Sequence, residues 1–260
     1  MKKIIKRFRS PVHFLFLLLA SNIQAQSWIM LEANNSVTYI GNGWIKSIDI
    51  DEEGNDLTSI FNSSRDVIIM IDDANGMYTQ GSGENYCQAM KSLREEMNKQ
   101  MPPEHVKMMQ DMLNEQKAKP APKVTVSKEA GKVIAGYQTS KYSIYVDGEL
   151  FEEKWISNDP ALNSIINTLK ASQELLSATV TCSLPEGWPL NASPEFSTEY
   201  KKVESSGVEL KSIMYEYGDA QTQTDVISIE KEDIPESEFE VPGDYKNVSF
   251  KEFLMSMSDM

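Results

Sequence analysis

The sequence predicts an α+β fold with an antiparallel sheet and helices gathered on one side. Short apolar runs separated by Asn, Asp and Gly occupy residues 28–80 and recur after residue 124. A Met-, Lys- and Glu-rich segment of helical character lies at 84–119, and a long apolar helical stripe runs from 159 to 182. Strands, two helices, strands, a long helix and strands again favour a single antiparallel sheet covered by helices. A chain of 260 residues is long enough for one sizeable core.

The N-terminal segment is typical of a secretory signal peptide. Five basic residues between positions 2 and 9 precede the apolar stretch Phe14 to Ala20, and small residues follow up to Ala25. Seven apolar residues are too few to span a bilayer, and no later stretch reaches the required length. We expect cleavage after Ala25, or after Ser27, and a soluble periplasmic or secreted protein of about residues 26–260 with no transmembrane segment.

The first strands are expected between Trp28 and Gln80, separated by turns at 34–35, 41–43, 53–56, 62–64 and 75–76. Asn75-Gly76 is the strongest hairpin signal, because a two-residue type I′ turn requires a positive φ at both central positions. The run Val67 to Ile71 is apolar without alternation. Such a strand is expected to be covered on both faces.

The segment 84–119 predicts a Met-rich helical hairpin, inserted into the domain and broken at Pro102-Pro103. Pro103 fits the first turn of the second helix, where its missing N–H costs nothing. Helical spacing places apolar residues on one face of each helix. They are Tyr86, Met90, Leu93, Met97 and Met101 in the first helix, and Val106, Met109, Met112 and Leu113 in the second. Three interpretations stay open: packing onto the sheet, a movable cover over an apolar ligand, and thioether ligands for Cu(I).

The second half predicts strands at 124–127, 132–135, 142–146 and 150–155, with Asp147-Gly148 as a hairpin turn. Asp159-Pro160 then opens a helix that continues to about Cys182, with Asp159 as its cap. Strands are expected at 196–203, 208–217, 224–229 and 239–241, followed by a short C-terminal helix. Leu184 to Pro189 ends the long helix.

The two cysteines suggest a disulfide in an oxidising compartment. Cys87 and Cys182 could close a loop of 95 residues, which would stabilise the protein by roughly 4 to 5 kcal/mol in the chain-entropy model. Two separately buried thiols are the alternative.

Charge and histidine content exclude several classes of function. Without residues 1–25 the chain would hold 20 basic and 39 acidic residues, and a formal charge of −19 argues against nucleic acid and anionic membranes. His105 would then be the only imidazole, which disfavours a histidine-dependent catalytic triad and a conventional zinc site. We expect no enzyme activity, no cofactor and no metal. A protein partner with a basic face stays possible.

Four segments resemble an uncharacterised family of exported bacterial proteins. They are Val133 to Tyr142, Gly148 to Trp155, Gln100 to Glu104, and the ending Ile229 to Tyr245. That family is similar to the LolA and LolB lipoprotein carriers, and the likeness covers roughly residues 36–246. The resemblance implies a curved, antiparallel half-barrel sheet with helices packed on its concave side.

These observations predict an exported, non-catalytic protein that binds a hydrophobic or amphiphilic ligand, such as a lipid or lipoprotein, between sheet and helices. The alternatives are a fully packed interaction protein that acts through its acidic surface, and copper binding by a Met cluster. Candidate ligand-binding residues lie on the elements expected to face each other across the two layers. They are Met70, Met97, Met109, Trp155 and Leu169.

Overall fold

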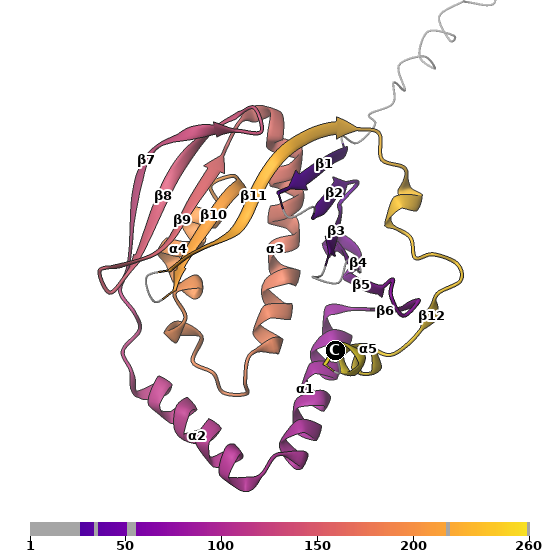
Figure 1. The fold of residues 1–260 in the computed structure, drawn as a ribbon, viewed down its shortest axis with the longest axis vertical. Helices are drawn as coiled ribbons and strands as arrows, with labels where there is room; N and C mark the ends of the chain where they lie inside the picture. Colours follow the sequence, from indigo (N-terminus) through magenta and orange to yellow (C-terminus); the bar gives the residue numbers. More distant parts are fainter. Residues whose placement is uncertain (1–26, 34–35, 51–55, 217–218, 259–260) are drawn as a thin grey trace, which may run out of the picture.

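The computed structural model describes residues 27–33, 36–50, 56–216 and 219–258 of the chain (Figure 1). The predicted signal peptide lies outside the described residues. So do the predicted turn at Asn34-Asn35 and most of the predicted turn at 53–56.

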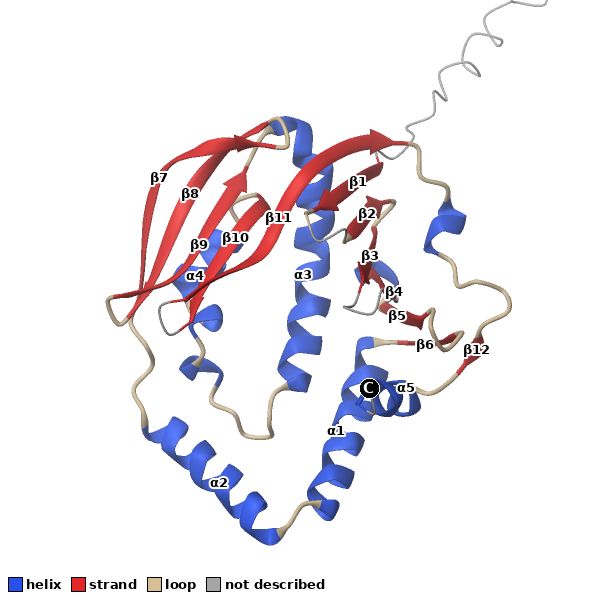
Figure 2. Cartoon of the chain, viewed as in Figure 1, coloured by secondary structure: helices blue, strands red, loops and turns tan. Residues whose placement is uncertain are grey.

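In the described part of the chain, twelve strands form one open, curved sheet (Figure 2). Its order is β12-β6-β5-β4-β3-β2-β1-β11-β10-β9-β8-β7. Neighbouring strands are antiparallel, except that the short β12 runs parallel to β6. The strands are β1 (Ser27–Glu32), β2 (Val37–Gly41), β3 (Trp44–Ile50), β4 (Asp56–Asn62), β5 (Val67–Asp72), β6 (Met77–Gly81), β7 (Val124–Ile134), β8 (Tyr137–Val146), β9 (Glu149–Ser157), β10 (Val208–Glu216), β11 (Asp219–Glu232) and β12 (Lys246–Asn247).

The helices lie between and after these strands. They are α1 (Gly83–Gln100), α2 (Pro103–Ala118), α3 (Asn163–Ser183), α4 (Thr198–Glu204) and α5 (Phe250–Ser258). Helix α3 crosses the concave side of the sheet between its two halves (Figure 1). The predicted α+β class and the large, curved, half-barrel-like antiparallel sheet are therefore confirmed.

The N-terminal half of α3 forms the main core with the middle of the sheet. Leu162 and Ile165 are fully buried in one cluster with Trp28 and Ile40. The indole Nε1 of Trp28 donates a hydrogen bond to Ser164 Oγ at 2.7 Å. Burial of these side chains stabilises the fold by about 1.5 to 3 kcal/mol each. One edge of the predicted apolar stripe of α3 thus packs against the sheet.

Strand β5 is covered on both faces, as its apolar sequence predicts. Ile68 packs with Leu175 of α3 and Phe250 of α5 on one side. Ile69 and Ile71 pack on the other side into a cluster with residues of the segment 234–245. In that cluster Phe239 stacks on Trp44 of β3, with ring centres 6.0 Å apart. A strand enclosed in this way has no solvent-facing side, so its residues need not alternate.

Two predicted hairpin turns have different outcomes. Asp147-Gly148 joins β8 to β9 with positive φ at both residues, 54° and 95°, as expected. Asn75-Gly76 belongs instead to the four-residue connection 73–76, in which Gly76 but not Asn75 has a positive φ. The Asp72 carboxylate accepts hydrogen bonds from the Asn75 backbone N and Nδ2, at 3.0 and 2.7 Å. These side-chain bonds hold Asn75 in the longer turn.

Residues 196–203 were predicted as a strand, but most of them lie in helix α4 (Thr198–Glu204). The hydroxyl of Ser197 accepts a hydrogen bond from the Tyr200 backbone N at 3.2 Å and caps the helix. Tyr200 and Val203 are buried three residues apart, on one helical face. The cap and this spacing outweigh the β-propensity of the aromatic and branched residues. The predicted strand at 239–241 is likewise replaced, by a 3-10 turn at Glu236–Phe239.

Helices α1 and α2 diverge instead of packing together as a hairpin (Figure 1). The extended backbone at Met101 and Pro102, with ψ of 136° and 140°, separates their axes. Helix α1 packs against α3 and α5. None of the α2 side chains is buried, so its predicted packing onto the sheet is not seen.

A disulfide joins Cys87 of α1 to Cys182 of α3, with Cα atoms 5.2 Å apart. The Arg94 side chain donates a hydrogen bond to the Cys182 carbonyl oxygen at 2.7 Å. Tyr86 and Ser183 hydroxyls pair at 3.2 Å beside it. These contacts fix α1 against the C-terminal end of α3.

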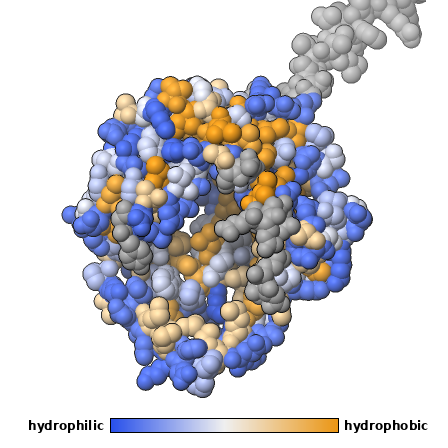
Figure 3. Space-filling view, in the orientation of Figure 1, coloured by the Kyte–Doolittle hydropathy of each residue, from blue (hydrophilic) through white to orange (hydrophobic). Residues whose placement is uncertain are grey.

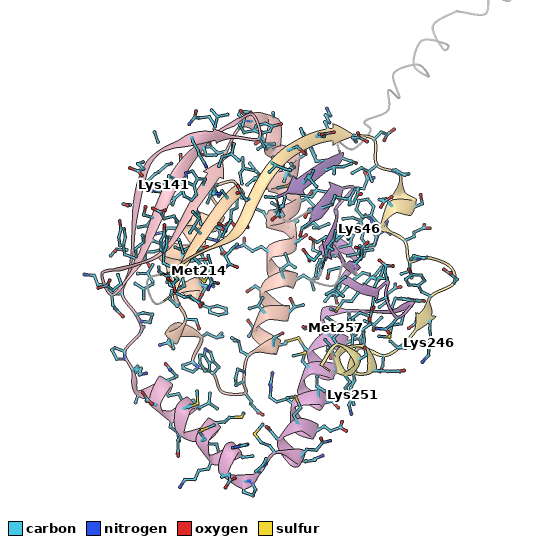
Figure 4. All side chains as sticks on the ribbon, viewed as in Figure 1. Lys46, Lys141, Met214, Lys246, Lys251 and Met257 are labelled. Carbon is cyan, nitrogen blue, oxygen red and sulfur yellow. A yellow bond between two sulfur atoms is a disulfide. The ribbon has the colours of Figure 1, made fainter. Side chains whose placement is uncertain are left out.

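Lys141 and Lys46 lie on the two halves of the sheet (Figure 4), and each forms an ion pair. Lys141 of β8 contacts Glu153 at 2.6 Å, and Lys46 of β3 contacts Glu238 at 2.7 Å.

None of the described helices has both the length and the apolar content needed to cross a membrane.

Candidate functional site

A pocket of about 630 Å³ lies between α3, the connection that follows it, α4 and the adjoining ends of β9 and β10. Figure 3 shows this face of the molecule hollowed at its centre, with apolar residues in the hollow. The volume is within the range of small-molecule sites in proteins. The pocket is therefore the main candidate site in the described part of the chain.

One wall of the pocket is an apolar face of α3. Ile166, Leu169, Leu176 and Val180 line it at helical spacing. The neighbouring face, with Ile165, packs against the sheet. Ile166 and Leu169 also pack against the core cluster that contains Ile165, so the apolar stripe of α3 serves both the core and the pocket. Apolar surface that remains unfilled in this way is a common mark of a ligand site.

The opposite wall is formed by the connection from α3 to β10. Leu184 and Phe196 line the pocket from this segment, and Ile156 does so from β9. At Gly207 the backbone passes very close to Ser157 of β9. A Cβ atom at this position would lie 2.2 Å from the Ser157 carbonyl oxygen. A larger residue would push this wall outwards.

The polar end of the pocket carries acidic side chains. Glu204 is the last residue of α4, and Glu209 lies near the start of β10. Glu209 lies opposite Ile156 in the β10–β9 register, so its side chain projects from the same side of the sheet. Lys201 also lines this end, with its ammonium 5.5 Å from the centre of the Phe196 ring.

Glu209 belongs to a buried network of charges beneath the pocket. The Lys154 ammonium lies 2.8 Å from Glu209 Oε2 and 3.3 Å from Glu152 Oε1. The Tyr200 hydroxyl donates a hydrogen bond to Glu152 Oε2 at 2.6 Å. Side-chain exposure is 8% for Lys154, 3% for Glu152 and 28% for Glu209. The network therefore fastens α4, and with it one wall of the pocket, to the sheet.

Burial and neighbouring charges shift the pKa values of this network. Burial raises the pKa of Glu152, and Lys154 and Tyr200 only partly oppose that effect. Burial also acts to raise the pKa of Glu209, but the Lys154 ammonium and hydrogen bonds hold it below its ordinary value. Burial opposes the charge on Lys154, yet its anionic neighbours raise its pKa overall. Glu209 and Lys154 consequently form an ion pair at neutral pH.

Glu204 differs from Glu209 in lacking an ion-pair partner among the described residues. Glu204 is exposed on α4, yet partial burial against the protein raises its pKa, and repulsion from Glu209 and Glu152 raises it further. Lys154 and Lys201 are close enough to lower it, without forming an ion pair with it within 4 Å. The negative charge on Glu204 is therefore only partly compensated.

The five candidate residues from the sequence do not come together in one site. Leu169 lines the pocket. Met70 packs beside Ile68 in the cluster beneath α3 and α5, and Trp155 is buried in the main core cluster. Met97 on α1 is 55% exposed, and Met109 on α2 is partly exposed. Neither helix of the Met-rich segment contributes a lining residue to the pocket.

Sequence reasoning missed the polar end of the pocket. Glu152 and Lys154 lie on the same side of β9 as Ile156, and Trp155 between them faces the main core cluster on the other side. Charged residues at inward-facing strand positions were the available signal, but it depends on knowing which face is covered. Glu204 gave no signal, because the segment directly before it, 196–203, was predicted as a strand.

In the residues that the structure describes, no three His, Cys, Asp or Glu side chains are placed to hold a metal ion. A second hollow of about 480 Å³ lies beside the stacked pair Trp44 and Phe239. It is lined by the charged Arg65, Glu236 and Glu240 as well as by these rings. The first pocket has the longer apolar wall.

Comparison with known proteins gives a family without an assigned activity. No match was found among curated proteins or among solved structures. Residues 50–245 match the model of a family described as "Domain of unknown function (DUF4412)". This match spans the helical segment, β7 to β11 and every residue that forms the pocket. The chain therefore belongs to the DUF4412 family.

Proposed function

We propose that this protein is an exported, non-catalytic carrier or sensor that binds an amphiphilic molecule in the pocket beside α3. The observation that carries the proposal is the apolar wall of Ile166, Leu169, Leu176 and Val180 around a space of about 630 Å³. Burying an apolar chain against such a wall gains about 25 cal/mol per Å² of apolar surface removed from water.

The arrangement of sheet and helix supports the same proposal. A half-barrel-like sheet with a helix on its concave side is what the resemblance to the LolA and LolB carriers implies. Likeness of fold is a weak guide to function, so the apolar wall carries the argument. Export rests on the basic and apolar N-terminal sequence.

The proposal is tested by titrating the protein with the neutral fluorescent probe N-phenyl-1-naphthylamine. We expect saturable binding to one site and a loss of about tenfold in affinity for Leu169→Gln, because the amide would face an apolar ligand without a partner. Met97→Gln is the matched control, since Met97 is exposed and lies outside the pocket.

Two results would contradict the proposal. One is the absence of saturable binding, and the other is equal weakening by Leu169→Gln and Met97→Gln. Either result would favour a packed interaction protein that acts through its acidic surface.

A further inference from the structure

We propose that the pocket selects a single-chain amphiphile whose head group is a cation that donates hydrogen bonds, such as a primary ammonium. This inference rests on the proposed function and adds the class of ligand. It is carried by the size of the pocket, the apolar wall of α3, and the carboxylates that end that wall.

The size of the pocket limits the number of chains. A methylene group occupies about as much space as a water molecule, roughly 30 Å³. About 630 Å³ thus holds one chain of up to about 18 carbons together with part of a head group. Two such chains would exceed it. A ligand with two or three acyl chains would leave apolar surface outside the pocket.

The polarity of the pocket sets the direction in which a chain enters. Leu169 and Leu176 line the α3 wall, whereas Glu204 and Glu209 line the polar end. An amphiphile gains most when its chain contacts the leucines and its head group meets the carboxylates, since the reverse would bury a charge against apolar side chains.

Two of the three carboxylates that line the pocket have no cation in direct contact among the described residues. Glu209 shares Lys154, which lies behind it and is nearly buried. Glu204 and Glu195 have no ion-pair partner within 4 Å in the described part of the chain. An ammonium group can donate up to three hydrogen bonds and would supply the missing positive charge.

The lysines that line the pocket do not reverse this preference. Lys201 and Lys170 are both exposed, the Lys201 ammonium lies 5.5 Å from the centre of the Phe196 ring, and neither lysine forms an ion pair with Glu204 within 4 Å. A carboxylate head group placed at the polar end would meet Glu204 and Glu209 at close range. Like charges that close repel each other and disfavour binding.

The test compares dodecylamine, dodecanol, dodecanoate and didodecylamine by isothermal titration calorimetry, below the concentration at which each forms micelles. We expect one dodecylamine per protein, bound at least tenfold more tightly than dodecanol or dodecanoate. Didodecylamine should bind more weakly than dodecylamine. The preference for dodecylamine over dodecanol should fall about tenfold in Glu204→Gln, the loss expected for one charge-assisted hydrogen bond.

A matched control separates the pocket from the general attraction of an acidic protein for cations. Glu199→Gln removes the same charge from the exposed first turn of α4, outside the pocket. It should leave the preference within about twofold, as expected for a distant, screened charge.

Other outcomes would overturn the inference in different ways. Equal binding of the first three probes, tighter binding of dodecanoate, or equal effects of Glu204→Gln and Glu199→Gln would refute the cationic head group. Tighter binding of didodecylamine would refute the single chain. In these cases the proposed function stands, whereas binding of no probe at all would refute both.

Discussion

Removing the Lys154 side chain should destabilise the protein far more than removing a surface lysine. In Lys154→Met, Glu209 and Glu152 keep their buried positions and lose the ammonium that lies 2.8 and 3.3 Å away. Breaking a buried ion pair from one side costs about 3 to 5 kcal/mol. Glu209 is partly exposed and Glu152 can take up a proton, so we expect the lower part of that range, roughly 3 to 4 kcal/mol.

The assay is urea unfolding followed by tryptophan fluorescence, at pH 7 and again near pH 4. The matched control is Lys246→Met, which removes an exposed partner of Glu252 and should cost at most about 1 kcal/mol. The pKa of Glu209 is lowered in the folded protein, so its contribution is present above the unfolded value of 4.5 and is lost as the pH falls through the folded value. The cost of Lys154→Met should therefore shrink near pH 4.

Two results would refute this reasoning. A loss in Lys154→Met no larger than in Lys246→Met would show that the network adds no stability. An equal loss at both pH values would show that the charge on Glu209 is not what Lys154 compensates.

Three further predictions concern the disulfide, Tyr200 and the Met-rich segment 84–119. Thiol titration of the unfolded, unreduced protein should find no free thiol, and Cys87→Ser with Cys182→Ser should lower the free energy of unfolding by roughly 4 to 5 kcal/mol. Tyr200→Phe removes the hydroxyl that donates to Glu152 and should cost about 1 to 3 kcal/mol in urea unfolding, whereas no loss would contradict the bond. Met108→Gln should change stability by less than about 0.5 kcal/mol, because Met108 is 55% exposed, and a larger loss would show that α2 packs on another element.

Local sequence patterns predicted most of the sheet and the long helix. The apolar run at 67–71 indicated a strand covered on both faces, and β5 is covered by α3 and α5 on one side and by the segment 234–245 on the other. Asp147-Gly148 indicated a two-residue hairpin, because only such residues readily adopt positive φ. These features depend on neighbours in the sequence, so periodicity and turn chemistry suffice.

Features that depend on distant contacts could not be predicted in the same way. The helical periodicity of α3 showed an apolar stripe but not that part of it lines a pocket, because the opposite wall comes from residues 184–209. The formation of α4 depended on the helix cap that Ser197 provides, an interaction that the helix and strand propensities of single residues do not include. The cysteine count suggested the bridge between Cys87 and Cys182, which the structure contains, but the choice between a bridge and two free thiols depended on how α1 lies against α3, across 95 residues of chain.

The Met-rich segment 84–119 shows what helical periodicity cannot predict. Its spacing predicted two helices and a break at the prolines, and α1 and α2 begin and end close to the expected residues. Amphipathic spacing does not state what an apolar face contacts, and α2 buries none of its methionines. The prediction that this segment covers an apolar ligand stays untested.

The most direct test of the account is native mass spectrometry of the protein purified gently from the exported fraction of its own cells, followed by denaturation and analysis of what is released. We expect one bound amphiphile per protein, with a single chain and an amine-bearing head group, and less of it on Leu169→Gln than on Met97→Gln. A protein that carries no amphiphile in the wild type would contradict the account.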